Sequence, residues 1–389
     1  MLEIAFAVPG CLDAPTGGYG YARKLLALAP GFGVNLTPIR LPGGFPHPSR
    51  DELAETERLL SASQRPLHLV DGLAYGALPA ALVRRLPGAT IALVHHPLAF
   101  ESGLAPERRD ALLCSEREAL AEARHVIASS RFTARLLAAD FNVPADKLSI
   151  AEPGTEPAPR AKGTGLPVQV LAVGAVSPRK GYDVLVRALA GMRDLEWRLT
   201  IAGSLDRAPQ AANALAALIA AEGLAGRIAL AGAVDDAMLA RLYDRADVFV
   251  SPSLFEGYGM VLAEAMARGL PIVASTGGAA AETVPDAAAI KVAPGDAARL
   301  AAALADMIAD AQLRRRFADA TWPAAQDASA KRRRSCASAI MSASAAASAA
   351  ASPGGTLMAA ASGTVSAAAP PVEATIGSPR AIASARTMP

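Results

Sequence analysis

Two glutamates, Glu256 and Glu264, are separated by seven residues and stand on either side of a Gly-x-Gly turn. An apolar run at 247–250 precedes them, and a second run at 271–274 follows an alanine-rich stretch typical of a helix. Carboxylates accept hydrogen bonds from hydroxyl groups. This order of strand, loop, helix and strand predicts a hydroxyl-binding site at a strand end. Two unrelated glutamates in an ordinary α/β domain are the plainer alternative.

The residues between the glutamates add a second kind of binding. The first N–H groups of a helix lack partners within the helix and form a natural anion site. At the predicted start of this helix, these donors belong to Gly257, Tyr258 and Gly259. A site for hydroxyl groups beside a site for phosphate indicates a nucleotide sugar as the ligand.

A second turn carries two cations. The apolar run 168–173 is followed by Gly174, and Arg179 and Lys180 come just before Gly181. Arginine can bind a phosphate through two hydrogen bonds, and lysine binds it as a point charge. We therefore predict that this turn binds a diphosphate, with a solvated basic turn as the alternative.

Further candidates lie at strand ends in the N-terminal half. Gly17 and Gly18 follow the first apolar run, where glycine lets backbone N–H groups approach an anion, although a purely structural loop fits as well. His95 and His96 follow another apolar run without a third ligand at metal spacing, so no metal site is predicted. We choose His95 as the histidine that faces the site, with a buried structural histidine as the alternative. Arg131, next to a serine helix cap, is a weaker candidate.

The segment from Glu256 to Glu264 resembles the Glu-x7-Glu motif of retaining glycosyltransferases, especially family 4, which has the two-domain GT-B fold. The resemblance covers residues 1–320 and is strongest over 165–285. It implies that Glu256 lies by the donor-sugar hydroxyls and that Glu264 binds the nucleotide ribose. The turn with Arg179 and Lys180 is similar to the phosphate loop of the family.

The same resemblance implies that Gly17 and Gly18 approach the donor phosphates from the opposite domain and that His95 contacts the donor sugar. It implies an enzyme without a bound metal or cofactor, which moves a sugar from a nucleoside-diphosphate sugar to a glycan or lipid-linked acceptor. We expect a role in bacterial polysaccharide or cell-envelope synthesis. The alternatives are a non-catalytic nucleotide-sugar-binding protein and an inactive relative with a damaged C-terminus. A GT-B epimerase lacks support because its motifs are built differently.

The elements that position these residues alternate along the chain. Strands are predicted at 2–8, 34–41, 67–70, 90–94 and 125–128 in the first half, and at 168–173, 197–202, 228–231, 247–250, 271–274 and 289–292 in the second. Helices are predicted between them, at 19–28, 50–62, 75–85, 105–123, 130–139, 182–190, 209–221, 236–245, 296–309 and 311–320. This alternation favours parallel sheets covered on both faces, whose ligands bind beyond the carboxyl ends of the strands.

We therefore predict an α/β protein with two Rossmann-like, doubly wound domains that face each other across a cleft. The N-terminal acceptor-side domain spans 1–152, a linker rich in proline and glycine spans 153–167, and the nucleotide-sugar-binding domain spans 168–322. Residues 323–389 are rich in alanine and serine and are predicted to be a disordered tail. The helix that braces the N-terminal domain in the family is not recognisable there.

Composition narrows the function further. The 389 residues are 52% hydrophobic, but no apolar run reaches the ~18 residues of a membrane span. Six cations against two acids give the predicted tail a net charge of +4, so the rest of the chain carries −2 of the total +2, and nucleic-acid binding is not expected. The three cysteines show neither metal spacing nor a disulfide framework. We expect a cytoplasmic protein, with contact at the inner face of the plasma membrane left open for a lipid-linked acceptor.

Overall fold

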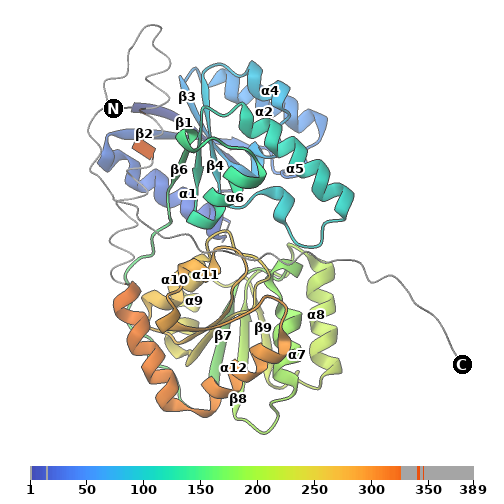
Figure 1. Ribbon diagram of the computed structural model, residues 1–389, viewed down its shortest axis with the longest axis vertical. Coiled ribbons are helices and arrows are strands. Elements are labelled where there is room, and N and C mark those ends of the chain that lie inside the picture. Colours follow the sequence, from blue (N-terminus) through green and yellow to red (C-terminus); the bar gives the residue numbers. More distant parts are fainter. Residues whose placement is uncertain (1, 15, 326–339, 342–344, 346–389) are drawn as a thin grey trace, which may run out of the picture.

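The computed structural model describes residues 2–14, 16–325, 340, 341 and 345. They form two α/β domains, each built on a six-stranded sheet in which every strand pair is parallel. Figure 1 shows the two sheets one above the other, each with helices packed against it. None of the helices in the described part of the chain has the length and apolar character that a membrane span requires.

The N-terminal sheet has the strand order β2-β1-β3-β4-β5-β6. Its strands are β1 Leu2–Pro9, β2 Val34–Leu41, β3 Leu67–Asp71, β4 Ala89–Val94, β5 His125–Ala128 and β6 Leu148–Ile150. Its helices are α1 Gly17–Leu28, α2 Arg50–Ala62, α3 Gly72–Tyr75, α4 Ala80–Arg85, α5 Pro106–Ala121 and α6 Arg131–Asp140, with short 3-10 turns η1 Ala29–Phe32, η2 Leu98–Phe100 and η3 Ala145–Lys147.

The C-terminal sheet has the strand order β12-β11-β10-β7-β8-β9. Its strands are β7 Val168–Val173, β8 Trp197–Ala202, β9 Ile228–Gly232, β10 Val248–Ser251, β11 Ile272–Ser275 and β12 Ala289–Val292. Its helices are α7 Tyr182–Ala190, α8 Pro209–Ala221, α9 Asp236–Arg245, α10 Met260–Ala267, α11 Ala280–Thr283 and α12 Ala297–Ala309, with 3-10 turns η4 Pro178–Lys180 and η5 Asp286–Ala288. A further helix follows over 311–325.

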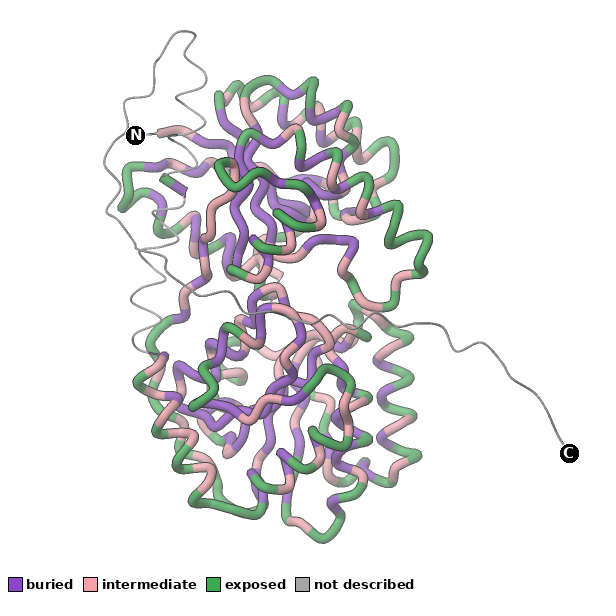
Figure 2. Tube along the Cα trace, in the orientation of Figure 1, coloured by how far each residue is buried: buried purple, intermediate pink, exposed green. Residues whose placement is uncertain are grey.

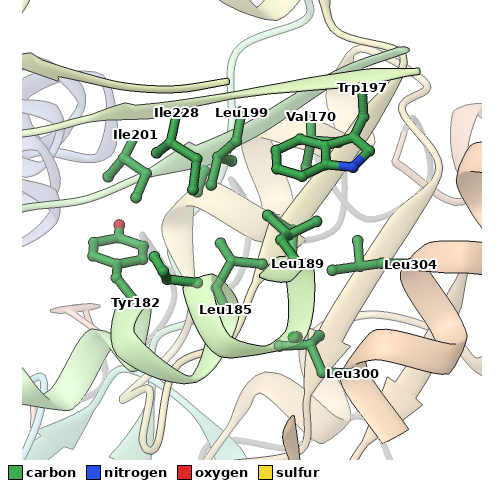
Figure 3. Close-up of a cluster of buried hydrophobic side chains, with 14 of the residues drawn as sticks. Val170, Tyr182, Leu185, Leu189, Trp197, Leu199, Ile201, Ile228, Leu300 and Leu304 are labelled. Carbon is green, nitrogen blue, oxygen red and sulfur yellow. The ribbon is translucent and has the colours of Figure 1, made fainter. Parts of the chain in front are cut away.

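Apolar strands buried on both faces form the cores of the two domains, as Figure 2 shows by the purple sheets inside each one. In the C-terminal core, Trp197 and Leu199 of β8 pack with Leu185 of α7 and Leu300 of α12 (Figure 3). The indole N–H of Trp197 donates to the Met192 carbonyl oxygen at 2.7 Å, so this ring is buried without an unsatisfied donor. These cores hold the strand ends in place, and the strand ends position the site.

One local prediction was wrong, and one strand was missed. The single helix expected at 75–85 is two short helices, α3 and α4, because Pro79 between them has an extended backbone and no N–H group to donate. The edge strand β6 was not predicted, since three half-buried residues give no readable alternation. The proline-rich segment at 152–165 contains neither helix nor strand, as a linker would.

The predicted start of the tail also needs correction. Residues 323–325 continue the helix that begins at 311, so Pro323 does not end it. Ile340 is helical and buried in a cluster with Ile4, Phe6 and Val34 of the N-terminal sheet. The chain therefore does return to the N-terminal domain at this point, which lies near β2 in Figure 1. The remaining prediction for the tail concerns residues outside the described ones.

Candidate functional site

The charged centre of the site is the carboxylate of Glu256, in the loop between β10 and α10. Lys180 Nζ lies 2.6 Å from its Oε1, and Arg179 Nη1 lies 3.3 Å from its Oε2. Ser253 Oγ also donates to Oε1 at 2.7 Å. Burial by itself would raise the pKa of Glu256, but the charges of Lys180 and Arg179 outweigh it and lower the pKa to about 2. Glu256 is therefore ionised and acts only as an acceptor at neutral pH.

The two cations come from η4, which follows β7. Gly181 has a φ of +63°, and a Cβ atom there would lie 2.4 Å from the Pro252 carbonyl oxygen, so only glycine lets the two loops approach. The Leu254 N–H donates to the Arg179 carbonyl oxygen at 2.8 Å, which joins this turn to the loop that carries Glu256. The Arg-Lys-Gly sequence and the first glutamate thus form one unit at neighbouring strand ends.

Arg179 also reaches the N-terminal domain. Its Nη1 donates to the Phe255 carbonyl oxygen at 2.7 Å, and its Nε lies 3.4 Å from Glu101 Oε1. Burial opposes the ionisation of Glu101, but the adjacent His96 and the charge of Arg179 together lower its pKa. The predicted phosphate-binding arginine therefore lies between two carboxylates, one from each domain.

The Gly-x-Gly turn packs directly against the N-terminal domain. A Cβ atom on Gly257 would lie 2.0 Å from the His95 carbonyl oxygen, so this close contact between the domains requires glycine. Thr133 Oγ1 donates to the Gly257 carbonyl oxygen at 3.2 Å. Gly259, with a φ of +89°, precedes the first residue of α10. The turn is thus held from the opposite domain at the point where the N–H groups of α10 begin.

Glu264 lies in the second turn of α10 and is half-buried. Its Oε2 accepts a hydrogen bond from the Tyr243 hydroxyl at 3.0 Å. Burial raises the pKa of Glu264, and the Tyr243 hydrogen bond and the charge of Arg268 offset part of this rise. Among the described residues, no hydrogen bond joins Glu264 to Glu256 or to the two cations, so the glutamates provide two separate binding points.

Both histidines lie near the domain contact, in different surroundings. His95 Nε2 lies 3.1 Å from Asp71 Oδ2, and the ring of Tyr21 meets the His95 ring edge-on at 5.3 Å. The His96 ring lies 4.7 Å from the ring of Phe255 in the other domain. The sequence prediction chose between the two, whereas the structure gives both a place beside the site.

The glycines at the start of α1 lie opposite these groups. A Cβ atom on Gly17 would lie 3.4 Å from Met260 Cγ at the start of α10, and one on Gly18 would lie 3.9 Å from His95 Cδ2. The structure therefore brings Gly17 and Gly18 toward both the Gly-x-Gly helix and His95. Arg131, in contrast, is exposed, with its Nε 4.0 Å from Glu152.

Several site residues were not found from the sequence. Asp71 ends β3 and binds His95, Glu101 pairs with Arg179, and Tyr243 binds Glu264. The sequence could have indicated Asp71, because an acid at the end of an apolar strand lies at the ligand-binding edge of a parallel sheet. No sequence pattern indicated Glu101 or Tyr243, since their partners are distant in the sequence.

Comparisons with known proteins match both domains to glycosyl transferase families. A family model for glycosyl transferases group 1 matches residues 167–310, and a glycosyl transferase 4-like domain matches residues 14–154. A D-inositol 3-phosphate glycosyltransferase from Xylanimonas cellulosilytica is 32% identical over 238 residues, which are 57% of this chain and 57% of the relative. The lipopolysaccharide core biosynthesis mannosyltransferase LpcC of Rhizobium leguminosarum is 37% identical over 156 residues, 39% of this chain and 44% of the relative. The chain thus spans about half the length of the curated relatives it matches.

Solved structures share the fold at lower sequence identity. Sucrose-phosphate synthase from Thermosynechococcus elongatus has a TM-score of 0.73 at 21% identity, covering 84% of this chain and 95% of its own. HepE from Anabaena, solved in complex with UDP-glucose, has a TM-score of 0.70 at 19% identity, covering 88% of this chain and 100% of its own. Since the two family models lie on the two sheet domains described above, the chain belongs to the GT-B glycosyltransferases of the family 4 (group 1) type.

Proposed function

We propose that this protein is a retaining glycosyltransferase, which moves a sugar from a nucleoside-diphosphate sugar to a hydroxyl group of a glycan or lipid-linked acceptor. The observation that carries the proposal is the cluster of Glu256, Lys180 and Arg179, buried where the two domains meet. An ionised carboxylate can accept hydrogen bonds from sugar hydroxyls. Two adjacent cations can bind the diphosphate that leaves.

The reaction places its developing negative charge on the departing diphosphate. Arg179 and Lys180 stabilise this charge together with the N–H groups that begin α10, because donors fixed by the fold need little rearrangement during the reaction. With these donors in place, the proposed reaction needs no resident metal or organic cofactor. The sugar passes through an oxocarbenium-like state, and the acceptor attacks from the face that the diphosphate leaves. The diphosphate then accepts the acceptor's proton, so no strong general base is required.

The relatives support the donor and the setting that we propose. HepE was solved with UDP-glucose, which supports a nucleotide sugar as the donor. One relative is named for lipopolysaccharide core biosynthesis, which supports a role in envelope polysaccharide synthesis. We infer that the protein works in the cytoplasm and meets a lipid-linked acceptor at the inner face of the plasma membrane.

The first test is a thermal-shift panel of the full chain with UDP, GDP, ADP and their common sugars. A nucleotide at ~100 times its dissociation constant should stabilise the folded state by about 2.7 kcal/mol. A shift with one base identifies the donor class. A cooperatively melting chain that no nucleotide stabilises would contradict the proposal.

The second test is the stereochemistry of the product. With the donor found in the panel, transfer to an acceptor should give a product whose anomeric configuration, read by NMR, matches that of the donor. An inverted product would reject the retaining mechanism while leaving the transferase intact. Nucleotide binding without transfer or donor hydrolysis would instead indicate the non-catalytic binding protein.

A further inference from the structure

Tyr243 of α9 joins the core of the C-terminal domain to the site. Its side chain is fully buried, with the ring stacked on Phe249 at a centroid distance of 5.9 Å. Its hydroxyl points out of this apolar cluster and donates to Glu264 Oε2 at 3.0 Å. The ring is therefore fixed by the core, and the hydroxyl is fixed by the ring.

Arg268 holds the other side of the same arrangement. Its guanidinium carbon lies 4.3 Å from the centre of the Tyr243 ring, and its Nη1 donates to the Glu264 backbone carbonyl oxygen at 3.1 Å. The guanidinium thus covers the ring and ties it to α10. Among the described residues, Oε1 of Glu264 receives no hydrogen bond, so one carboxylate oxygen is fixed and the other is free to bind a ligand.

The Glu264 carboxyl lies near helix α1 of the N-terminal domain. The charge of Lys24 on α1 acts on the Glu264 carboxyl, and α10 begins against Gly17 of the same helix. Burial and the Glu264 charge both raise the pKa of Tyr243 well above its ordinary value, so the hydroxyl keeps its proton and remains a donor. Glu264 therefore has one oxygen held by Tyr243 and a second oxygen that accepts no hydrogen bond among the described residues.

We propose that Tyr243 is a positioning residue, whose hydroxyl orients Glu264 toward the ribose hydroxyls and so makes the protein select nucleotides with an intact ribose. This inference rests on the proposed function, because it assumes that Glu264 binds the ribose. A charge-assisted hydrogen bond contributes about 1.5–3 kcal/mol, which corresponds to a ~10–150-fold preference. Part of that preference should depend on the Tyr243 hydroxyl.

The experiment compares the full-length wild type with Tyr243→Phe, which keeps the ring and removes the hydroxyl. Tyr75→Phe is the matched control, because Tyr75 is also fully buried and its hydroxyl bonds to Thr90 Oγ1 at 3.0 Å in the N-terminal domain. Calorimetry gives the affinities for UDP and for 2′,3′-dideoxy-UDP, or for the GDP or ADP pair if the panel selects that base. If Tyr243→Phe does not melt cooperatively, Tyr243→Met replaces it, since methionine fills irregular space without a donor.

The wild type should prefer UDP over its dideoxy analogue, and Tyr243→Phe should reduce this preference by ~10-fold through weaker UDP binding. Affinity for the dideoxy analogue should stay unchanged, and Tyr75→Phe should keep the wild-type preference. Removing the hydroxyl also raises the pKa of Glu264 further, so Glu264 takes up its proton at a higher pH. As pH is lowered, UDP binding by Tyr243→Phe should therefore weaken at a higher pH than UDP binding by the wild type.

The other outcomes would contradict the positioning role of Tyr243, the ribose assignment of Glu264 or the proposed function. An unchanged preference in Tyr243→Phe, or an equal loss of affinity for both nucleotides, overturns the positioning role and leaves the proposed function standing. A wild type that binds both nucleotides equally rejects Glu264 as the ribose ligand, and the inference falls with it. A wild type that binds no nucleotide overturns the proposed function as well.

Discussion

The charge state of Glu256 depends on Lys180 and Arg179. Burial raises the pKa of Glu256, but nearby charges lower it to about 2, and the charge of Lys180 has the largest lowering effect. Lys180→Gln therefore leaves a buried carboxylate with one cation fewer, and removing a partner from a buried ion pair is strongly destabilising. The variant also loses one donor to the diphosphate, so we expect transfer to fall by at least ~100-fold.

The measurement for Lys180→Gln is the transfer rate together with the melting temperature. Lys162→Gln is the control, because Lys162 in the linker pairs with Asp244 on an exposed surface of the C-terminal domain. We expect Lys162→Gln to retain wild-type activity, since exposed pairs contribute about 0–1 kcal/mol. Wild-type transfer by Lys180→Gln would remove Lys180 from the proposed mechanism.

Glu264 permits a separate residue-scale prediction. Glu264→Gln removes the charge but keeps the size of the side chain, so the fold should persist while nucleotide affinity falls by ~10-fold or more. Calorimetry with UDP, GDP or ADP measures the affinity, and circular dichroism checks the fold. Unchanged affinity would contradict the ribose assignment.

At the scale of elements, α5 contains a buried acid that the proposed reaction does not use. Glu116 is 1% exposed and accepts a hydrogen bond at 3.4 Å from the Ala99 N–H of η2, the turn between His96 and Glu101. Burial raises its pKa from the ordinary 4.5 to about 7, although the η2 N–H groups oppose the rise. Between these two values the folded chain keeps a proton that the unfolded chain releases. Its contribution to stability is therefore complete below pH 4.5 and is lost as pH rises through 7.

Glu116→Gln should remove this dependence because the amide does not ionise. The melting temperature of Glu116→Gln, compared with that of the wild type at the same pH, should rise from pH 5 to pH 8. By pH 8 the free energy of unfolding of the variant should have gained on the order of 3 kcal/mol relative to the wild type. Glu118→Gln, at an exposed position of the same helix, should follow the wild type. If the Glu116→Gln and wild-type curves stay parallel over this range, Glu116 does not titrate as described.

The elements themselves were largely predictable because their signals are local. The boundaries of β2, α2, α7, β8 and α12 follow from apolar runs, from turns and from caps such as the Ser49–Glu52 capping box. The break at Pro79 was missed because the apolar pattern continues across it. Contacts such as Asp71 with His95 join neighbouring strands of the sheet, and strand order cannot be read from local periodicity.

At the scale of the whole molecule, the sequence predicted two facing domains but not how they touch. The contact centres on Phe255, the residue before Glu256. Its ring lies 4.7 Å from that of His96, 5.7 Å from that of Phe132 and 6.2 Å from that of Phe100, all in the N-terminal domain. An apolar residue in a loop gives no sequence signal for such a role, because its partners come from a separate sheet. The position of Glu256 thus depends on both domains being together.

Phe255→Ala tests this dependence. Aromatic pairs contribute about 0.5–1.5 kcal/mol each beyond their buried area, so losing these contacts should lower the equilibrium constant for domain contact by at least ~10-fold. We expect transfer to fall by a similar factor, while UDP, GDP or ADP affinity falls less, because Arg179, Lys180 and Glu264 all belong to the C-terminal domain. Phe32→Ala, at a position that is 41% exposed in η1, should match the wild type in both assays. Equal losses of nucleotide affinity and transfer in Phe255→Ala would instead show that Phe255 shapes the loop of its own domain, and that domain contact does not control the reaction.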